Sequence, residues 1–378
     1  MKNNIFNYQF ISKIIILIYT FLLTKILINK SLFYNNNIKS YVNNTLITNI
    51  KQIRFIIVNA PDHNNYGDEA ILMSTKEFLK NFFPTIEQII IFSNENYYNI
   101  NLIKYIIKPN DIIIISGGGY FGFYEYVIQG QINIIKTFPL NNIFLFPCSI
   151  YLNKTKLKRY KQYIDAYNNH KHLTLFTRDL LSYKTAVNLF NFKSIYNVPD
   201  IVTRLNLKFK NKVINRKGVL LNLRKDNEIL LTENNHKFIK NLILKFFNNS
   251  IYEKDSNKFK VSKGSNKEKE TIKFIKFVRK KELVLTDRLH GMILSIITNT
   301  PCIVFGNNYH KVESSYYSWF KDIQYVIFID NKNIEKELEN SIIKLKNLKN
   351  YTLFNKYKYK NYYLLMKKKI QEKIDSMI

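Results

Sequence analysis

Residues 283–305 read LVLTDRLHGMILSIITNTPCIVF. The stretch begins and ends with a short apolar run, and between the two runs polar residues lead into an apolar segment long enough for a helix. Continuous apolar runs, as opposed to alternating ones, are typical of strands that are buried on both faces. The stretch therefore predicts a β–α–β unit of a parallel sheet, with a strand at 282–285, a helix at 289–298 and a strand at 302–305.

The same pattern recurs in both directions along the chain. Apolar runs rich in Ile, Val and Phe are separated by stretches of roughly 15–30 residues, each long enough for a crossover helix. The pattern predicts an α/β fold, with helices at 69–80 and 271–280 and a Lys-rich helical segment after residue 333. The remaining strands are expected at 53–58, 88–92, 111–116, 142–146, 173–176, 193–196 and 218–223.

Length and composition exclude several classes of protein. The chain has 378 residues, of which 46% are hydrophobic and 15% aromatic, so it can bury a full core and is not predominantly disordered. Two cysteines, Cys148 and Cys302, exclude a framework of several disulfides and a multi-cysteine zinc site. We predict a hydrophobic segment at 1–30, a linker at 31–50, domains at 51–212 and 213–332, and a basic helical segment at 333–378.

The net charge of +30, from 58 Lys and Arg against 28 Asp and Glu, raises the question of an anionic partner. Only eight of the cations are arginines, the residues that read phosphates and bases with a planar fork. Lys, Asn, Ile, Tyr and Phe are all abundant, which is typical of an AT-rich genome. We therefore expect no nucleic acid partner, and attraction of an anionic substrate or of a membrane stays open.

The first thirty residues contain an apolar run, Ile14 to Thr24, that lies between Lys13 and Lys25. Terminal lysines can extend to lipid headgroups, and no small-residue cleavage site follows. The pattern favours an uncleaved membrane anchor or interfacial helix, with a buried or surface-docked helix as the alternative. Membrane association through this single anchor and a cytoplasmic location both remain open.

Polar residues follow several predicted strands of the first domain, where ligands of open α/β sheets bind. Asn65 and Asp68 lie in the sequence NYGD, either as a helix cap or as ligand-binding residues. Gly117, Gly118 and Gly119 follow the strand IIIIS, and they could bring backbone N–H groups close to an anion or form a tight turn. Arg178 ends the strand LTLF, in either an anion site or a structural ion pair.

A second group of polar residues follows the strands of the second domain. Arg224, Arg288 and Lys311 each come after a predicted strand, and His290 opens a predicted helix. Three cations at the carboxyl ends of one sheet, beside a helix N-terminus, predict an anion-binding site. Histidine is the side chain best suited to acid–base work near neutral pH, so His290 is a candidate catalytic residue.

These motifs stand in the order in which one known family carries them. They are NYGDEAI at 65–71, IIISGGGYFG at 113–122, TRD at 177–179 with Ser182, VPD at 198–200, LNLR at 221–224, the stretch at 283–305, and Lys311. The chain thereby resembles the polysaccharide pyruvyl transferase family over about residues 50–325. The last long motif is the most specific of them.

The resemblance implies two Rossmann-like domains that face each other across a cleft, as in GT-B glycosyltransferases. It implies transfer of a pyruvyl group from phosphoenolpyruvate to two hydroxyls of one sugar, as a ketal, in glycan biosynthesis. Asp68 matches the family's Gly-Asp motif, Arg178 its Thr-Arg-Asp arginine, and Arg288 and His290 its Arg-Leu-His pair. The stretch from Arg224 to Thr271 is short for half of such a domain, so one strand is expected to be missing or degenerate.

We therefore expect His290 and Asp68 to be catalytic, with phosphoenolpyruvate and a glycan acceptor as substrates and no metal or other cofactor. Two other functions stay open. One is a nucleotide-sugar glycosyltransferase of similar architecture, and the other is a non-enzymatic basic protein that binds membranes or nucleic acid. The expected substrate-binding residues are Arg178, Arg288, Arg224, Lys311, Gly117, Gly118, Gly119 and Asn65.

Overall fold

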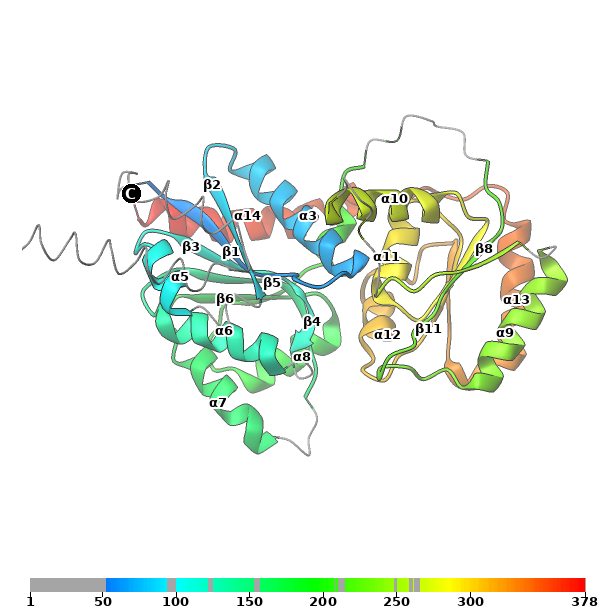
Figure 1. Ribbon diagram of the computed structural model, residues 1–378, viewed down its shortest axis with the longest axis horizontal. Helices are drawn as coiled ribbons and strands as arrows, with labels where there is room; N and C mark the ends of the chain where they lie inside the picture. Colours follow the sequence, from blue (N-terminus) through cyan, green and yellow to red (C-terminus); the bar gives the residue numbers. More distant parts are fainter. Residues whose placement is uncertain are drawn as a thin grey trace, which may run out of the picture. The chain divides into compact units, whose positions relative to one another are not determined.

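The structure is a computed structural model, shown in Figure 1. It describes residues 52–93, 100–121, 125–152, 157–207, 209, 215–247, 250–257, 261 and 266–377. The hydrophobic segment and the linker predicted at 1–30 and 31–50 lie outside the described residues. Among the residues that are described, no helix combines the length and the apolar content that crossing a bilayer requires.

The first lobe is built on a seven-stranded parallel sheet with the order β2-β1-β3-β5-β6-β7, in which β4 pairs with β5. All strands predicted for this lobe are present. The pairing follows from their apolar runs: β1, β3 and β5 are buried along their whole length. The strands are β1 (Arg54–Ala60), β2 (Glu87–Phe92), β3 (Ile112–Ile115), β4 (Gly118–Phe121), β5 (Ile143–Ile150), β6 (Leu173–Thr177) and β7 (Ile195–Asn197).

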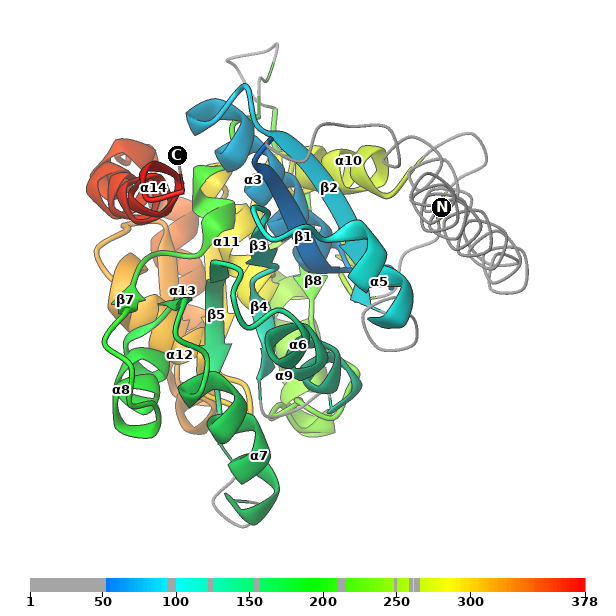
Figure 2. The same ribbon diagram turned by 90° about the vertical axis from the view of Figure 1, so that its left-hand side faces the viewer.

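The helices of the first lobe cover both faces of this sheet. In Figures 1 and 2, α3 and α14 lie on one side of the sheet and α6 and α7 on the other. This arrangement buries the sheet and leaves the carboxyl ends of its strands for a ligand. The elements are α3 (Tyr66–Phe82), α5 (Ile100–Ile106), α6 (Glu125–Thr137), α7 (Leu157–Asn168), α8 (Leu180–Leu189) and the 3₁₀ helix η2 (Ile201–Arg204).

The second lobe is built on a five-stranded parallel sheet with the order β12-β11-β10-β8-β9. The β–α–β unit predicted from residues 283–305 lies at its centre, as β10, α11 and β11. The elements are β8 (Val219–Asn222), α9 (Glu233–Phe246), β9 (Ile251–Glu253), α10 (Lys267–Arg279), β10 (Leu283–Thr286), α11 (Leu289–Ile297), β11 (Cys302–Phe305), α12 (Lys311–Ser315), η3 (Tyr316–Phe320), β12 (Val326–Ile329), η4 (Asn331–Asn333) and α13 (Ile334–Asn347).

Three strands of the structure were not predicted: β4, β9 and β12. In the stretch from Arg224 to Thr271, where a missing or degenerate strand was expected, the structure has the strand β9, which is only three residues long. It is held by pairing with β8 rather than by burial, because its side chains are exposed or half-buried.

The segment predicted at 333–378 is helical, and its two long helices pack on different lobes. Helix α13 contacts α9 and β12 of the second lobe. The final helix α14 (Lys360–Asp375), which follows η5 (Lys356–Tyr359), returns to the first lobe, where the Tyr363 hydroxyl donates to the Asp200 carbonyl oxygen at 3.3 Å. One continuous cluster of buried apolar side chains includes residues of both sheets, and residues 53–378 form one compact unit.

Candidate active site

A cavity of about 260 Å³ lies at the carboxyl ends of strands from both sheets. All the predicted site residues except Gly118 line it, although they come from loops spread over more than two hundred residues of sequence. The parallel strands cause this convergence, since each predicted residue follows the carboxyl end of its strand. The predicted lining residues are Asn65, Asp68, Gly117, Gly119, Arg178, Arg224, Arg288, His290 and Lys311.

Arg288 is buried on the second-lobe side of the cavity, at the N-cap position of α11. Its Nη1 donates to the Asp226 carboxylate at 2.7 Å, and its Nη2 donates to the Asp255 carboxylate at 2.8 Å. Its Nε is buried and has no hydrogen-bond partner among the described residues. The two carboxylates thus fix the guanidinium plane and leave one charged N–H group without an acceptor.

Arg224 and Lys311 share a single carboxylate, that of Glu228. Arg224 Nη2 lies 2.7 Å from Glu228 Oε2, and Lys311 Nζ lies 2.6 Å from the same oxygen. Arg224 Nε donates to Asp226 at 3.0 Å, while its Nη1 is buried without a partner in the described part of the chain. Burial lowers the pKa of Lys311 to about 8, although Glu228 opposes the shift. Glu228 thus joins the two cations, and the unpaired Nη1 of Arg224 is left for an additional anion.

Arg178 is the corresponding cation of the first lobe. Its Nη1 lies 2.8 Å from Asp200 Oδ2, and its Nε donates to the Ser149 hydroxyl at 2.9 Å. Burial alone would raise the pKa of Asp200, but His290 and Arg178 outweigh it and lower that pKa to about 2. The buried ion pair is the structural arrangement that the sequence left open for Arg178, and the same side chain also lines the cavity.

The three glycines after β3 differ in what they contribute. A Cβ atom on Gly117 would lie 2.4 Å from the Pro147 carbonyl oxygen, so this glycine permits close packing on β5. Gly118 has φ 148° and belongs to β4. A Cβ atom on Gly119 would lie 2.8 Å from Arg178 Nη2 and 3.4 Å from Lys311 Nζ. Of the three, Gly119 is therefore the one that leaves room for cations from both lobes.

His290, in the first turn of α11, packs against the first lobe. A Cβ atom on Gly67 would lie 2.2 Å from His290 Nδ1, so the imidazole occupies space that only glycine leaves open. His290 Nε2 lies 3.5 Å from Asp200 Oδ2, which is too long for a strong hydrogen bond, and this buried nitrogen has no other partner among the described residues. The ring is thus held in place while one of its nitrogens remains unused.

Asn65 and Asp68 lie at the start of α3. The Asn65 side chain accepts from the backbone N–H groups of Gly67 and Asp68, at 2.8 and 3.3 Å, so it is the N-cap of the helix. Its amide also donates to the Asn257 side chain of the second lobe at 3.1 Å. Asn65 thereby both caps the helix and links the two lobes.

A residue that the sequence analysis did not select, His63, contacts Asp68. His63 Nε2 lies 2.8 Å from Asp68 Oδ2. Burial would raise the pKa of Asp68, but His63, His290 and Arg178 together lower it to about 2. At neutral pH Asp68 is therefore ionised and can accept a hydrogen bond but cannot donate a proton. The sequence signal for His63 was its place in the loop that leads to Asp68.

The cavity wall also contains uncharged residues, in addition to the charged ones. It offers hydroxyl and amide groups together with an aromatic ring, which are groups that bind sugars in proteins. Within the described ranges, no group of three or more His, Cys, Asp or Glu residues is arranged to hold a metal ion. Apart from the residues already named, the uncharged lining residues of the first lobe are Asn59, Pro61, Ser93, Ser116, Tyr120, Tyr126 and Val127.

Comparisons with known proteins assign the chain to a family. The sequence model of the polysaccharide pyruvyl transferase family matches residues 65–309. General stress protein 30 of Bacillus subtilis is 31% identical over 295 residues, which are 77% of this chain and 85% of that protein. Pyruvyl transferase 1 of Schizosaccharomyces pombe is 27% identical over 283 residues, which are 68% of either chain.

Among solved structures, an uncharacterised Klebsiella pneumoniae protein covers 78% of this chain and 99% of its own, with 21% identity and a TM-score of 0.48. The protein described here is a transferase, as the matched sequence and the cation-lined cavity between two α/β lobes together indicate. It belongs to the polysaccharide pyruvyl transferase family.

Proposed function

We propose that the protein transfers a pyruvyl group from phosphoenolpyruvate to two hydroxyls of one sugar residue of a glycan, forming a cyclic ketal. The observation that carries the proposal is a pair of buried, charged donors without acceptors in the described structure, Arg224 Nη1 and Arg288 Nε. Leaving a buried donor unpaired costs about 1–3 kcal/mol, and more when the group is charged. An anionic ligand in the cavity would supply the missing acceptors.

Phosphoenolpyruvate has two anionic groups, a phosphate and a carboxylate, and the cavity has cations on both sides. The second lobe offers Arg288, Arg224 and Lys311, beside the start of α11, which no side chain caps. Uncapped N–H groups at a helix N-terminus favour a phosphate. We assign the phosphate to this side and the carboxylate to Arg178 of the first lobe, whose charge attracts a carboxylate and whose Nη1 and Nε are held by Asp200 and Ser149.

We assign the acceptor sugar to the uncharged lining residues of the first lobe, which include Tyr126 and Ser93. In this pose the sugar hydroxyls point toward Asp68 and His290, which line the same cavity.

The transfer needs two stages. In the first, one sugar hydroxyl adds to C2 of the donor, its proton leaves, and C3 gains a proton and becomes a methyl group. In the second, the other hydroxyl bonds to C2, its proton leaves, and the C2–O bond to phosphate breaks, so that inorganic phosphate departs with a proton. Atoms and charge balance without an oxidant, a reductant or a metal.

Residues that line the cavity can carry out the proton transfers and the charge stabilisation that the two stages of the transfer require. His290 is placed to take a proton from a hydroxyl and to return it, since its Nε2 has no hydrogen-bond partner in the described structure. Asp68 is ionised and accepts a hydrogen bond from the attacking hydroxyl. Arg288, Arg224 and Lys311 stabilise the negative charge that grows on the departing phosphate.

Incubation of the purified protein with phosphoenolpyruvate and a panel of glycans tests the proposal. We expect release of inorganic phosphate that depends on both substrates, together with a gain in glycan mass. The same panel with nucleotide sugars is the matched comparison. Release of a nucleotide with transfer of a sugar, and no phosphate release from phosphoenolpyruvate, would replace the proposal with glycosyl transfer.

A further inference from the structure

The loop between β1 and α3 carries a histidine to which the proposed mechanism gives no role. His63 is half-exposed and lines the cavity. It lies outside the residues matched by the family model, which begin at Asn65. Its two ring nitrogens each face a carboxylate: Nε2 lies 2.8 Å from Asp68 Oδ2, and Nδ1 lies 3.3 Å from Asp62 Oδ1.

A carboxylate can only accept a hydrogen bond, so an imidazole that bonds two carboxylates needs a proton on both nitrogens. The two carboxylates accordingly raise the pKa of His63 to about 10. His63 is therefore a cation at neutral pH, and its Nε2–H group donates to one oxygen of Asp68. The other oxygen of Asp68 is left for a different donor.

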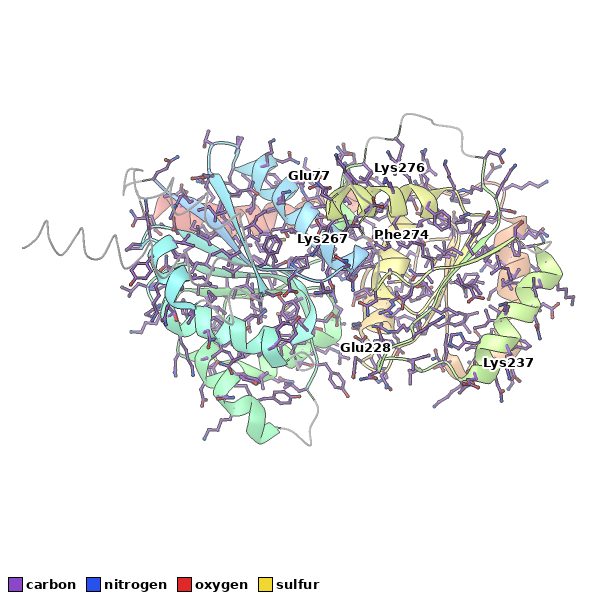
Figure 3. All side chains as sticks on the ribbon, in the orientation of Figure 1. Glu77, Glu228, Lys237, Lys267, Phe274 and Lys276 are labelled. Atoms are coloured by element: carbon purple, nitrogen blue, oxygen red, sulfur yellow. The ribbon has the colours of Figure 1, made fainter. Side chains whose placement is uncertain are left out.

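The second lobe holds the backbone of this loop. Lys267, at the start of α10, points its Nζ at three consecutive carbonyl oxygens: those of Pro61 at 3.3 Å, Asp62 at 2.8 Å and His63 at 3.3 Å. Figure 3 labels Lys267 and Phe274 on α10, and Phe274 stacks on Tyr66 of α3 with 4.2 Å between the ring centroids. The place of His63 thus depends on the lobe that also carries Arg288 and His290.

Other charged and polar groups also face the pair. Ser93 hydrogen-bonds Asp62, Glu69 faces Lys267, and His290 and Arg178 face Asp68 from the second lobe and the first. The histidine therefore sits between two carboxylates of its own lobe, while the cations from other elements act on Asp68. With His63 held in this way, Oδ2 is the oxygen of Asp68 that accepts its hydrogen bond.

We propose that His63 is a positioning residue for the transfer: it holds the Asp68 carboxylate toward the acceptor hydroxyl, and Lys267 fixes the loop that carries it. The inference rests on the proposed function and deepens it, because it makes the acceptor side of the site depend on contact between the two lobes. The acceptor side of the site is complete only when Lys267 hydrogen-bonds the backbone of the loop that carries His63. Binding of phosphoenolpyruvate, which uses the arginines, does not require the hydrogen bond between His63 and Asp68.

Three variants and one control test this inference in the full chain. His63→Ala removes the donor to Asp68, His63→Gln keeps an N–H donor without the charge, and Lys267→Met releases the loop. Lys76→Met is the control, since Lys76 also bridges the lobes, by an ion pair with Glu268 at 3.2 Å, but does not touch the loop. We expect His63→Ala and Lys267→Met to lower kcat roughly 10- to 100-fold.

In the same variants we expect the affinity for phosphoenolpyruvate, measured by calorimetry, to stay near that of the wild type. His63→Gln should recover most of the lost rate, and Lys76→Met should behave as the wild type. A merely structural role would lower the melting temperature of His63→Ala and leave the kcat of the folded protein unchanged, which would overturn the inference. A wild-type protein without transfer activity would instead refute the proposed function, and the inference with it.

The state of His63 provides a second readout that needs no activity. Nuclear magnetic resonance of protein with labelled histidine rings follows each of the six histidines, and His63→Gln identifies the resonance of His63. We expect this resonance to titrate near pH 10 in the wild type and at a lower pH in Asp68→Asn. Titration of the wild-type ring near pH 6.5, the value of a free histidine, would show that the pair does not form and would overturn the inference.

Discussion

At the scale of single residues, the site is a set of cations whose own counter-charges hold them in place. Arg288 lies between Asp226 and Asp255, Arg224 between Asp226 and Glu228, and Arg178 against Asp200. These carboxylates offset the mutual repulsion of the arginines, and they leave single N–H groups of Arg224 and Arg288 for a ligand. Removing one residue of such a pair costs free energy, because the charge of the remaining residue then lies in the protein without a counter-charge.

Replacement of Arg288 by Ala should weaken phosphoenolpyruvate binding by about 2–5 kcal/mol, the cost of removing one partner of a buried, hydrogen-bonded charge pair. Calorimetry with the donor measures the effect. Lys276→Ala, an exposed cation on α10 that is labelled in Figure 3, is the control for lost charge. Equal donor affinity in Arg288→Ala and Lys276→Ala would remove Arg288 from the donor site.

Replacement of His290 by Asn should lower kcat by roughly 10²–10⁴-fold with little change in donor binding, because Asn cannot carry the proton. His236→Asn, on α9 and outside the cavity lining, is the matched control. The melting temperature of the same preparations separates catalysis from folding. Near-normal kcat in His290→Asn would exclude an acid–base role.

Lys311 gives the site a pH dependence with a defined sign. Burial lowers the pKa of Lys311 to about 8 in the ligand-free protein, whereas a bound anion favours its charged form. Donor affinity should therefore fall as the pH rises above about 8. Calorimetry across this range should show the fall in the wild type, and a curve of the same shape in Lys311→Met would contradict the assignment.

At the scale of helices and strands, the site is built from the short segments, here called junctions, that connect the end of a strand to the start of the next helix. The chain leaves each strand at its carboxyl end, and the next few residues turn into the cavity before a helix begins. One pair of such junctions meets at the starts of α3 and α11, where the ring of His290 lies against Gly67. This contact positions a catalytic candidate of one lobe by the backbone of the other.

Replacement of Gly67 by Ala should therefore displace the His290 ring, because the new Cβ atom would lie 2.2 Å from Nδ1. We expect a fall in kcat similar to that of His290→Asn, and less than additive effects in the double variant, since both changes act on one contact. Gly306→Ala is the control, as its Cβ atom would lie 3.3 Å from a side-chain oxygen of Asn331. Additive effects would show that the two residues act separately.

The sequence was sufficient to predict the elements with continuous apolar runs. The strands β1, β3, β5, β10 and β11 are buried, and each was visible as such a run. Strand β4 contains two glycines and β9 is mostly exposed, so neither has the apolar pattern that marks a strand. Tertiary pairing with β5 and β8 decides their conformation instead.

The cations of the site could be predicted because each follows a strand, but their partners could not. Asp226, Glu228 and Asp255 lie in polar stretches where nothing in the local pattern distinguishes them from surface residues. Their pairing with arginines depends on which strand ends become neighbours in the folded sheet. For the same reason the contact of His63 with Asp68 emerged only from the structure.

At the scale of the whole molecule, two lobes share one core and are linked at several points around the cavity. Besides Lys267, Trp319 Nε1 of the second lobe donates to the Arg178 carbonyl oxygen at 2.9 Å, and Ser314 Oγ donates to Asp179 at 2.8 Å. The net charge of +30 adds a long-range attraction for anionic substrates that salt should weaken.

The apolar run near the N-terminus, which lies outside the described residues, leads to a prediction about the intact chain. We expect residues 10–28 to attach the protein to membranes, because the run is flanked by lysines that can reach the headgroups. Fractionation of the full-length protein, beside a variant with charged residues placed within 14–24, measures the effect. Equal distribution of both proteins in the soluble fraction would contradict it.

The central claim, formation of a ketal from phosphoenolpyruvate, is tested most directly by the structure of the product made in deuterated water with donor labelled with ¹³C at C2. Nuclear magnetic resonance should show the labelled carbon bonded to two oxygens of one sugar residue, beside a methyl group that carries one deuterium from the solvent. Phosphate release should match ketal formation mole for mole. A product that keeps the carbon–carbon double bond, or a glycan that gains no labelled carbon while phosphate is released, would contradict the account.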